Sequence, residues 1–170
     1  MAQRCQVIHP FNPVFTPASK ILILGSLPSE KSREQNFFYG HPRNRFWKVL
    51  AAVFDEPAPQ TVQAKIDLLT RYDIALWDAI YSCSIKGSSD SSIADVVPTD
   101  LSIILDHSNV HTIICNGRTA ERYYTKFQYP VTKINSIFLP STSPANAAYS
   151  LDQLVEIWKP VLLKALEPNK

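Results

Sequence analysis

Lys20-Ile21-Leu22-Ile23-Leu24-Gly25 is an unbroken apolar run that ends at a glycine, and the predicted fold is built around it. Such a run is typical of a parallel strand buried on both faces, because a strand with one wet face alternates apolar and polar residues. Three further short runs predict strands of the same kind, at residues 74–77, 112–115 and 134–139. Apolar residues at helical spacing predict helices at 43–54, 61–72, 98–105 and 119–127, and a last one from Ser150-Leu151-Asp152-Gln153, a capping box.

Alternating strands and helices predict an α/β fold, a three-layer αβα sandwich around a central, mostly parallel four-stranded sheet. We expect residues 1–170 to form a single domain. Its residues 1–19, punctuated by Pro10, Pro13 and Pro17, are predicted to form an extended arm packed on the body. Two polar segments, 30–38 and 81–92, are predicted to be loops, and the second of them to be flexible.

The chain of 170 residues is 45% hydrophobic and 19% charged, an ordinary globular balance. Its net charge of +2 is too small to indicate a nucleic-acid binder, so such a role must rest on local clusters of Lys and Arg. Three scattered cysteines without a Cys-x-x-Cys pair indicate a reducing compartment and argue against an iron–sulfur cluster or a structural zinc site. With no apolar run of membrane-spanning length and no signal peptide, we expect a soluble, cytoplasmic, monomeric protein without metal or cofactor.

Small polar residues follow each predicted strand, at 26–29, 78–84, 116–117 and 141–146. Ligands of parallel α/β sheets bind where the strands end at their carboxyl side, so these segments predict one pocket. None of them is expected to supply a charged general base. The chain also lacks a G-x-G-x-x-G or P-loop motif and a G-x-S-x-G nucleophile elbow. The predicted pocket therefore consists of amides, hydroxyls and backbone N–H groups, which suit a flat heterocycle.

Tyr39-Gly40-His41-Pro42-Arg43-Asn44-Arg45-Phe46-Trp47 immediately precedes an apolar helical pattern. The free N–H groups and the positive dipole end of a helix start suit an anionic ligand. Arg43 and Arg45 suit a phosphate, and Tyr39 suits a flat base. A plainer interpretation is a capped helix with a solvated basic turn, in which Asn44 is the N-cap.

The segments Gly25-Ser26-Leu27-Pro28-Ser29 and Phe38–Trp47 resemble the first motif region of the mismatch-specific branch of the uracil-DNA glycosylase superfamily. In that branch a G-x-N-P-G turn is followed by an aromatic residue and H-P-x-N-R-F-W. Ile114-Cys115-Asn116-Gly117-Arg118-Thr119-Ala120 resembles its G-K-x-A turn. Leu139–Asn146 resembles its second motif, and Ser150–Leu166 its closing helix, so the resemblance is co-linear from about Lys20 to Leu166.

The chain departs from that branch at Leu27, where the mismatch enzymes carry a catalytic Asn and the classical uracil enzymes an Asp. A first motif without this amide, followed by an intact H-P-x-N-x-F-W, is similar to the hypoxanthine-DNA (deoxyinosine) glycosylase branch. The resemblance implies a base-excision repair enzyme that flips deaminated bases out of DNA and hydrolyses their N-glycosidic bond. Hypoxanthine is the first expected base and uracil a further candidate. It also implies that Asn44 supplies the catalytic amide and that Asn116 contacts the base.

On this interpretation Asn44 either holds the attacking water through its carbonyl oxygen or donates its amide to the departing base. Tyr39 would stack on the base, and Asn116 would match the adjacent N–H and C=O of hypoxanthine or uracil. Further pocket contacts are expected from Ser26, Leu27 and Asp78, the last through backbone groups. Contacts to the DNA are expected from His41, Arg43, Ser141, Ser143, Ala145 and Asn146, with the wedge that fills the vacated stack in Ala145–Tyr149.

No lysine resembles the Schiff-base residue of a helix-hairpin-helix glycosylase, so we expect a monofunctional enzyme that does not nick the strand. Two other classes of function stay open. Leu27 suggests a nucleic-acid-binding module that has lost catalysis, and a small-molecule hydrolase would use Ser26 or Ser141 as its nucleophile. The sequence leaves the preferred base, the opposite base and the preference for single or double strands undecided.

Overall fold

The computed structural model describes residues 3–87 and 89–168, so residues 1 and 2 of the predicted arm and residue 88 of the predicted loop lie outside it. Its main sheet has four parallel strands in the order β3-β2-β6-β7. These strands span Ile74–Asp78, Ile21–Gly25, Thr112–Asn116 and Ser136–Leu139. All residues of the central strand β2 are buried, as an unbroken apolar run requires. The predicted α/β fold around a parallel four-stranded sheet is confirmed.

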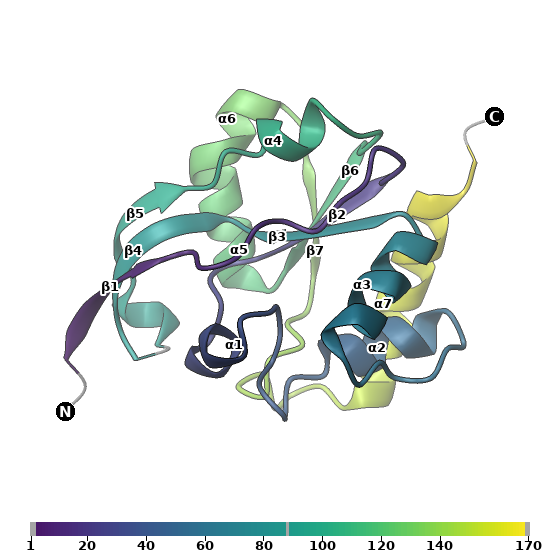
Figure 1. Ribbon diagram of the computed structural model, residues 1–170, viewed down its shortest axis with the longest axis horizontal. Helices are drawn as coiled ribbons and strands as arrows, with labels where there is room; N and C mark the ends of the chain where they lie inside the picture. Colours follow the sequence, from purple (N-terminus) through teal and green to yellow (C-terminus); the bar gives the residue numbers. More distant parts are fainter. Residues whose placement is uncertain (1–2, 88, 169–170) are drawn as a thin grey trace.

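Helices lie on both sides of this sheet (Figure 1). One group consists of α2 (Phe46–Val53), α3 (Val62–Arg71) and α7 (Leu151–Leu166), in which α7 packs on α2. The other group consists of α4 (Ser102–Leu105), α5 (Arg118–Tyr123), the π-helical turn η2 (Tyr124–Gln128) and α6 (Tyr129–Thr132). The predicted capping box is present at Ser150. None of the described helices is both long and apolar enough to cross a membrane.

A second, antiparallel sheet has the strand order β1-β4-β5 and lies beside the main one (Figure 1). Strand β1 spans Arg4–Ile8, β4 Ile80–Lys86 and β5 Ala94–Pro98, and the turn η1 spans Asp90–Ser92. Only Ala79 separates β3 from β4, so one stretch of chain serves both sheets. Residues Arg4–Ile8 of the predicted arm are thus extended and lie against β4. The expectation of a flexible loop at 81–92 is wrong, because most of this segment belongs to β4 and η1. Small polar residues carry little strand preference of their own, and pairing with the distant β1 orders them.

Three helix starts also differ from the prediction. The helix predicted at 98–105 begins only at Ser102, because Pro98 is the last residue of β5. Residues Glu30–Gln35 form helix α1 and not a loop, and Ser29 caps it by accepting a hydrogen bond from the N–H of Ser32. Helix α2 begins at Phe46, later than predicted, and Arg45 occupies its N-cap position. Asn44 nevertheless satisfies a free donor of the helix start, because its Oδ1 accepts from the Phe46 N–H at 2.9 Å.

Candidate functional site

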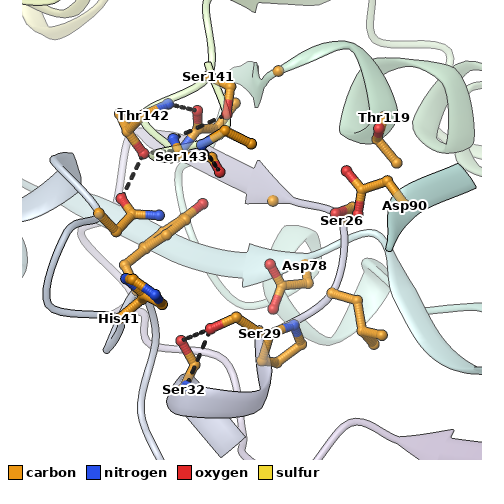
Figure 2. A pocket seen from close by; sticks show the side chains of 18 of the residues that line it. Ser26, Ser29, Ser32, His41, Asp78, Asp90, Thr119, Ser141, Thr142 and Ser143 are labelled. Atoms are coloured by element: carbon orange, nitrogen blue, oxygen red, sulfur yellow. Dashed lines mark hydrogen bonds between the residues drawn. The ribbon is translucent and has the colours of Figure 1, made fainter. Parts of the chain in front are cut away.

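A cavity of about 670 Å³ opens at the carboxyl ends of β2, β3 and β6 and beside the segment that follows β7 (Figure 2). Most of the site residues predicted from the sequence line it: Ser26, Leu27, Tyr39, His41, Asn44, Asp78, Asn116, Ser141, Ser143 and Ala145. Arg43 and Asn146 do not. The structure therefore gathers the predicted segments at the edge where parallel sheets bind their ligands.

Asn44, Thr142 and Asn116 form a hydrogen-bond network on one wall of the cavity. The Thr142 hydroxyl donates to Asn44 Oδ1 at 2.9 Å and accepts from Asn116 Nδ2 at 3.1 Å. The Thr142 N–H donates to Asn116 Oδ1 at 3.1 Å, so Asn116 is held at both ends of its amide. Dashed lines at Thr142 in Figure 2 mark this network. Asn116 and Thr142 are both buried.

This network leaves the amide nitrogen of Asn44 available. Asn44 Oδ1 accepts from the Phe46 N–H and from the Thr142 hydroxyl, which occupies both of its lone pairs. The Phe46 N–H is a donor only, so it also fixes which end of the amide is oxygen. Asn44 Nδ2 has no hydrogen-bond partner among the described residues. The geometry therefore favours a hydrogen-bond donor at Asn44 over an oxygen that holds water.

Tyr39 has one face of its ring occupied. The ring stacks on Phe46, with centroids 4.1 Å apart and an interplanar angle of 22°. Its φ of 54° lies in the left-handed region, which a bulky side chain adopts only at a cost in free energy. The hydroxyl is buried and makes no well-formed hydrogen bond with a described residue, although the Asn116 side chain lies near enough to lower its pKa in part. Burial raises the pKa of Tyr39, and the Asp78 carboxylate raises it further, so the hydroxyl stays a neutral donor.

Asp78 lines the cavity with its side chain and not only through backbone groups (Figure 2). Its Oδ2 lies 2.7 Å from Nε2 of His9, and both side chains are buried. Nδ1 of His9 lies 2.8 Å from the carbonyl oxygen of Phe11. The strand ends were predicted to supply no charged general base, and the structure places one carboxyl group there, that of Asp78 at the end of β3, in contact with the imidazole of His9.

Arg45 holds the loop 141–149 and does not reach out to a ligand. It donates to four carbonyl oxygens of the loop: through its guanidinium to Ser143 and Asn146 at 2.9 Å and to Tyr149, and through its backbone N–H to Thr142 at 3.1 Å. These contacts occupy Arg45 inside the protein, so its suggested role as a phosphate ligand is wrong. Arg43 is exposed, and its guanidinium pairs with no described residue.

The polar side chains of this loop also stabilise the loop itself. Ser141 Oγ accepts from the Ser143 N–H at 3.1 Å, Ser143 Oγ accepts from the Ala145 N–H at 3.2 Å, and Asn146 Nδ2 donates to the Ser141 carbonyl at 3.0 Å. The turn after β6 packs closely against it at Gly117, whose φ is 96°. A Cβ there would lie 3.0 Å from Cβ of Ser141, so the site requires glycine at this position.

Neither serine suggested as a hydrolase nucleophile has a histidine partner within the described residues, so that alternative loses its support. His41 accepts at Nδ1 from the Arg43 N–H at 3.1 Å and thereby orients its own turn. Leu27 is half-buried and packs against the smaller core under the second sheet. The described side chains include no group of three or more His, Cys, Asp and Glu placed to hold a metal ion.

Thr142 and His9 are site residues that sequence reasoning missed. Thr142 stands between two serines, and nothing in three adjacent hydroxyl residues indicates which one turns inward. His9 belongs to the predicted arm and directly follows β1. It reaches Asp78 because β1 pairs with β4, and its own N–H continues this pairing by donating to the Tyr81 carbonyl at 2.7 Å. No local signal in the sequence identifies either residue.

A family model described as the uracil DNA glycosylase superfamily matches residues 13–162. The chain is 35% identical over 156 residues to a Methanosarcina acetivorans protein named hypoxanthine DNA glycosylase, covering 89% of this chain and 95% of that relative. It is 34% identical over 115 residues to a protein of the same name from Methanosarcina barkeri, covering 66% and 73% respectively. Its fold is similar to the solution NMR structure of a Methanosarcina acetivorans protein provisionally named uracil DNA glycosylase. The TM-score is 0.79 at 31% identity, over 95% of this chain and 100% of that one.

Proposed function

Since the chain belongs to the uracil DNA glycosylase superfamily and is a DNA glycosylase, we propose that it hydrolyses the N-glycosidic bond of deoxyinosine and releases hypoxanthine. Uracil is the second candidate base. The observation that carries the proposal is the buried network in which Thr142 positions the amides of Asn44 and Asn116 on the cavity wall. Two relatives named for hypoxanthine support the choice of base.

Cleavage of an N-glycosidic bond leaves positive charge on the sugar and negative charge on the departing base. Hydrogen-bond donors that are already in place stabilise that base without reorganising during the reaction. Asn44 Nδ2 is such a donor, because the oxygen of the same amide already accepts two hydrogen bonds. An amide is too weak a base to deprotonate water, so the reaction we propose is largely dissociative, with Asn44 acting on the leaving group.

A base inside a duplex cannot reach a cavity at the sheet edge, so we propose that the nucleotide is flipped into it. The exposed Arg43 and the loop 141–149 are suited to bind the flanking phosphates, and the exposed Ala145 stands at the cavity rim where a wedge would enter the stack. We also propose a monofunctional enzyme, because no lysine of the chain resembles a Schiff-base residue.

The test is base release from duplexes that carry deoxyinosine, deoxyuridine or deoxyxanthosine, measured under single-turnover conditions. Hypoxanthine should appear in solution, and the strand should break only after alkali. Asn44→Ala should slow release by roughly 100-fold or more, the usual cost of losing one preorganised donor. Asn44→Asp is the matched control, because it keeps the acceptor of the Phe46 N–H while removing the amide donor, and it should be equally slow.

Folded wild-type protein that releases no base from any of these duplexes would overturn the proposal. If it still binds the duplexes with salt-dependent affinity, it is the binding module that Leu27 suggests. Full activity of Asn44→Ala together with an inactive Asn116→Ala would move the catalytic amide to Asn116.

A further inference from the structure

The structure has a second cavity, at the edge of the main sheet where the segment between β1 and β2 runs along β3 (Figure 1). Its volume is about 660 Å³, within the range of ligand-binding cavities. The segment is held there because Val14 and Leu76 of β3 each donate their N–H to the carbonyl of the other at 2.9 Å. Among residues 3–87 and 89–168, none lines both cavities. The proposed glycosylase activity therefore gives the second cavity no role.

Trp77 of β3 lines this second cavity and has an unsatisfied indole N–H. The chain has three tryptophans, and all three are buried. Trp47 donates its indole N–H to the Phe38 carbonyl at 3.1 Å, and Trp158 donates to the Pro140 carbonyl at 3.0 Å. Trp77 Nε1 is buried too, but it has no partner among the described residues. A buried donor without a partner costs free energy, so a ligand that brings an acceptor to it is favoured.

The walls of the second cavity are rich in aromatic residues and proline. Phe11 and Phe15 contribute partly buried rings, and Pro10 and Pro98 lie beside them. Tyr81 of β4 is 46% exposed, and its hydroxyl has no hydrogen bond within the part of the chain that the structure describes. Rigid aromatic rings that stay exposed are the side chains that most often anchor a binding partner. The cavity therefore offers an apolar contact surface that the core of this protein does not use.

Asp100 gives the second cavity a negative charge. Its Oδ1 accepts from the Ser102 hydroxyl at 2.7 Å and from the Ser102 N–H at 3.0 Å, and these hydrogen bonds hold the pKa of the carboxyl group below its usual value. Its Oδ2 has no partner among the described residues, none of whose lysines or arginines lines this cavity. Lys31 and Arg118, in contrast, line the first cavity. The second cavity therefore suits a cation and repels the phosphates of DNA.

We propose that the second cavity binds an extended, proline-containing peptide segment of a partner protein that carries a lysine or arginine. A carbonyl oxygen of the segment accepts from Trp77 Nε1, the basic side chain pairs with Asp100, and the proline rings pack on Tyr81. A polyproline II segment meets these requirements, because it has no internal hydrogen bonds and leaves its carbonyl oxygens free. Such a segment is extended before it binds, so an aromatic-lined groove orders it at little entropic cost. Binding at this cavity requires no glycosylase activity.

The experiment is an NMR titration of the full ¹⁵N-labelled chain with a blocked proline-rich peptide that carries one arginine. The indole N–H resonance of Trp77 should shift, because it gains an acceptor. Those of Trp47 and Trp158 should stay in place, because their N–H groups already donate to carbonyls of the protein. Two matched peptides serve as controls, one with glutamate in place of the arginine and one with glycine in place of each proline. Both should bind more weakly.

Two substitutions of exposed residues test the site itself and should leave the fold intact. Tyr81→Ala should weaken binding of the arginine peptide by roughly 10-fold, because it removes an aromatic anchor. Asp100→Asn keeps an acceptor for Ser102 and removes the charge, so it should weaken binding by roughly 2- to 5-fold, the usual worth of an exposed ion pair. Asp152→Asn is the matched control: Asp152 is exposed on α7 and has no partner among the described residues, and the affinity should not change.

An unmoved Trp77 resonance at millimolar peptide would overturn the proposal, as would equal affinities for the arginine and glutamate peptides or for the proline and glycine peptides. If a DNA duplex binds in a way that Tyr81→Ala weakens, and the peptide does not bind, the cavity belongs to the DNA interface and the proposal is wrong. Weaker peptide binding by Tyr81→Ala and Asp100→Asn, with base release from deoxyinosine duplexes at the wild-type rate, would support a peptide site separate from the first cavity.

Discussion

Thr142 is the single residue that joins the two amides of the cavity. Its hydroxyl donates to Asn44 and accepts from Asn116, and no other described side chain bridges them. Sequence motifs pointed to both asparagines. Thr142, which fixes their orientation, belongs to another motif, and its neighbours Ser141 and Ser143 do not contact either amide. Its role therefore follows from the contact alone.

We expect Thr142→Val to slow single-turnover base release by roughly 10- to 100-fold, because it leaves Asn116 Nδ2 without a described partner and leaves Asn44 Oδ1 with the Phe46 N–H alone. The free energy of unfolding should fall by about 1–3 kcal/mol, the cost of unsatisfied buried polar groups. Thr142→Ser keeps the hydroxyl and should retain most of the rate. Wild-type rates in the Thr142→Val variant would mean that the amides hold their orientation without the hydroxyl.

At the scale of elements, Arg45 connects the start of α2 to the loop 141–149. The planar guanidinium has several donors in a fixed geometry, so one side chain can satisfy several loop carbonyls at once. The loop has no regular structure of its own, and these hydrogen bonds, with those from its own serines, keep it against the cavity.

Arg45→Met should therefore release the loop while leaving the apolar packing of α2 in place. In hydrogen exchange, amides of residues 142–149 should lose protection, whereas those of Phe46–Val53 should not, and base release should slow. Arg43→Met is the matched control, since Arg43 is exposed and unpaired with described residues. It should weaken DNA binding without changing loop protection. Unchanged exchange in Arg45→Met would show that the loop is held by its own contacts.

The elements that the sequence predicted well are those whose pattern is local. Strand β2 follows from its apolar run, and α7 from its capping box and helical spacing. Strands β1 and β4 were missed, because β4 is rich in small polar residues and gains its hydrogen bonds from a partner at the other end of the chain. That error also hid His9, which lies directly after β1.

For the molecule as a whole, burial of ionisable groups in the core predicts a loss of stability in alkali. Burial raises the pKa of the Cys115 thiol from 9.0 to about 12, and burial also raises the pKa values of Tyr39 and Tyr124. The folded chain keeps these protons where the unfolded chain has begun to lose them. The stabilisation is complete below pH 9 and is lost as pH rises toward 12, so stability falls across that window.

The free energy of unfolding, measured in urea from pH 8 to pH 11, should show this decline. Each such group should lower it by about 1.4 kcal/mol per pH unit once that group is ionised in the unfolded chain. Cys115→Ala removes the thiol. Above pH 9 its free energy of unfolding should therefore fall less steeply with pH than that of the wild-type protein, by the contribution of one group, although the variant is less stable at neutral pH. Equal slopes in the two proteins would mean that Cys115 ionises as readily in the folded chain as in the unfolded one.

Local patterns in the sequence were enough to predict the parallel sheet, the long helices α2, α3 and α7, and the segments that meet at the carboxyl edge of the sheet, because apolar periodicity, caps and strand ends are local properties of the chain. The sequence also pointed to Asn44 and Asn116. The folded chain was needed to show which atoms of these amides are free to act, that Thr142 orients them, that Arg45 binds the loop 141–149, and that His9 contacts Asp78. Those features depend on hydrogen bonds between residues far apart in the chain, and the direction of a hydrogen bond is set by the folded geometry and not by residue type.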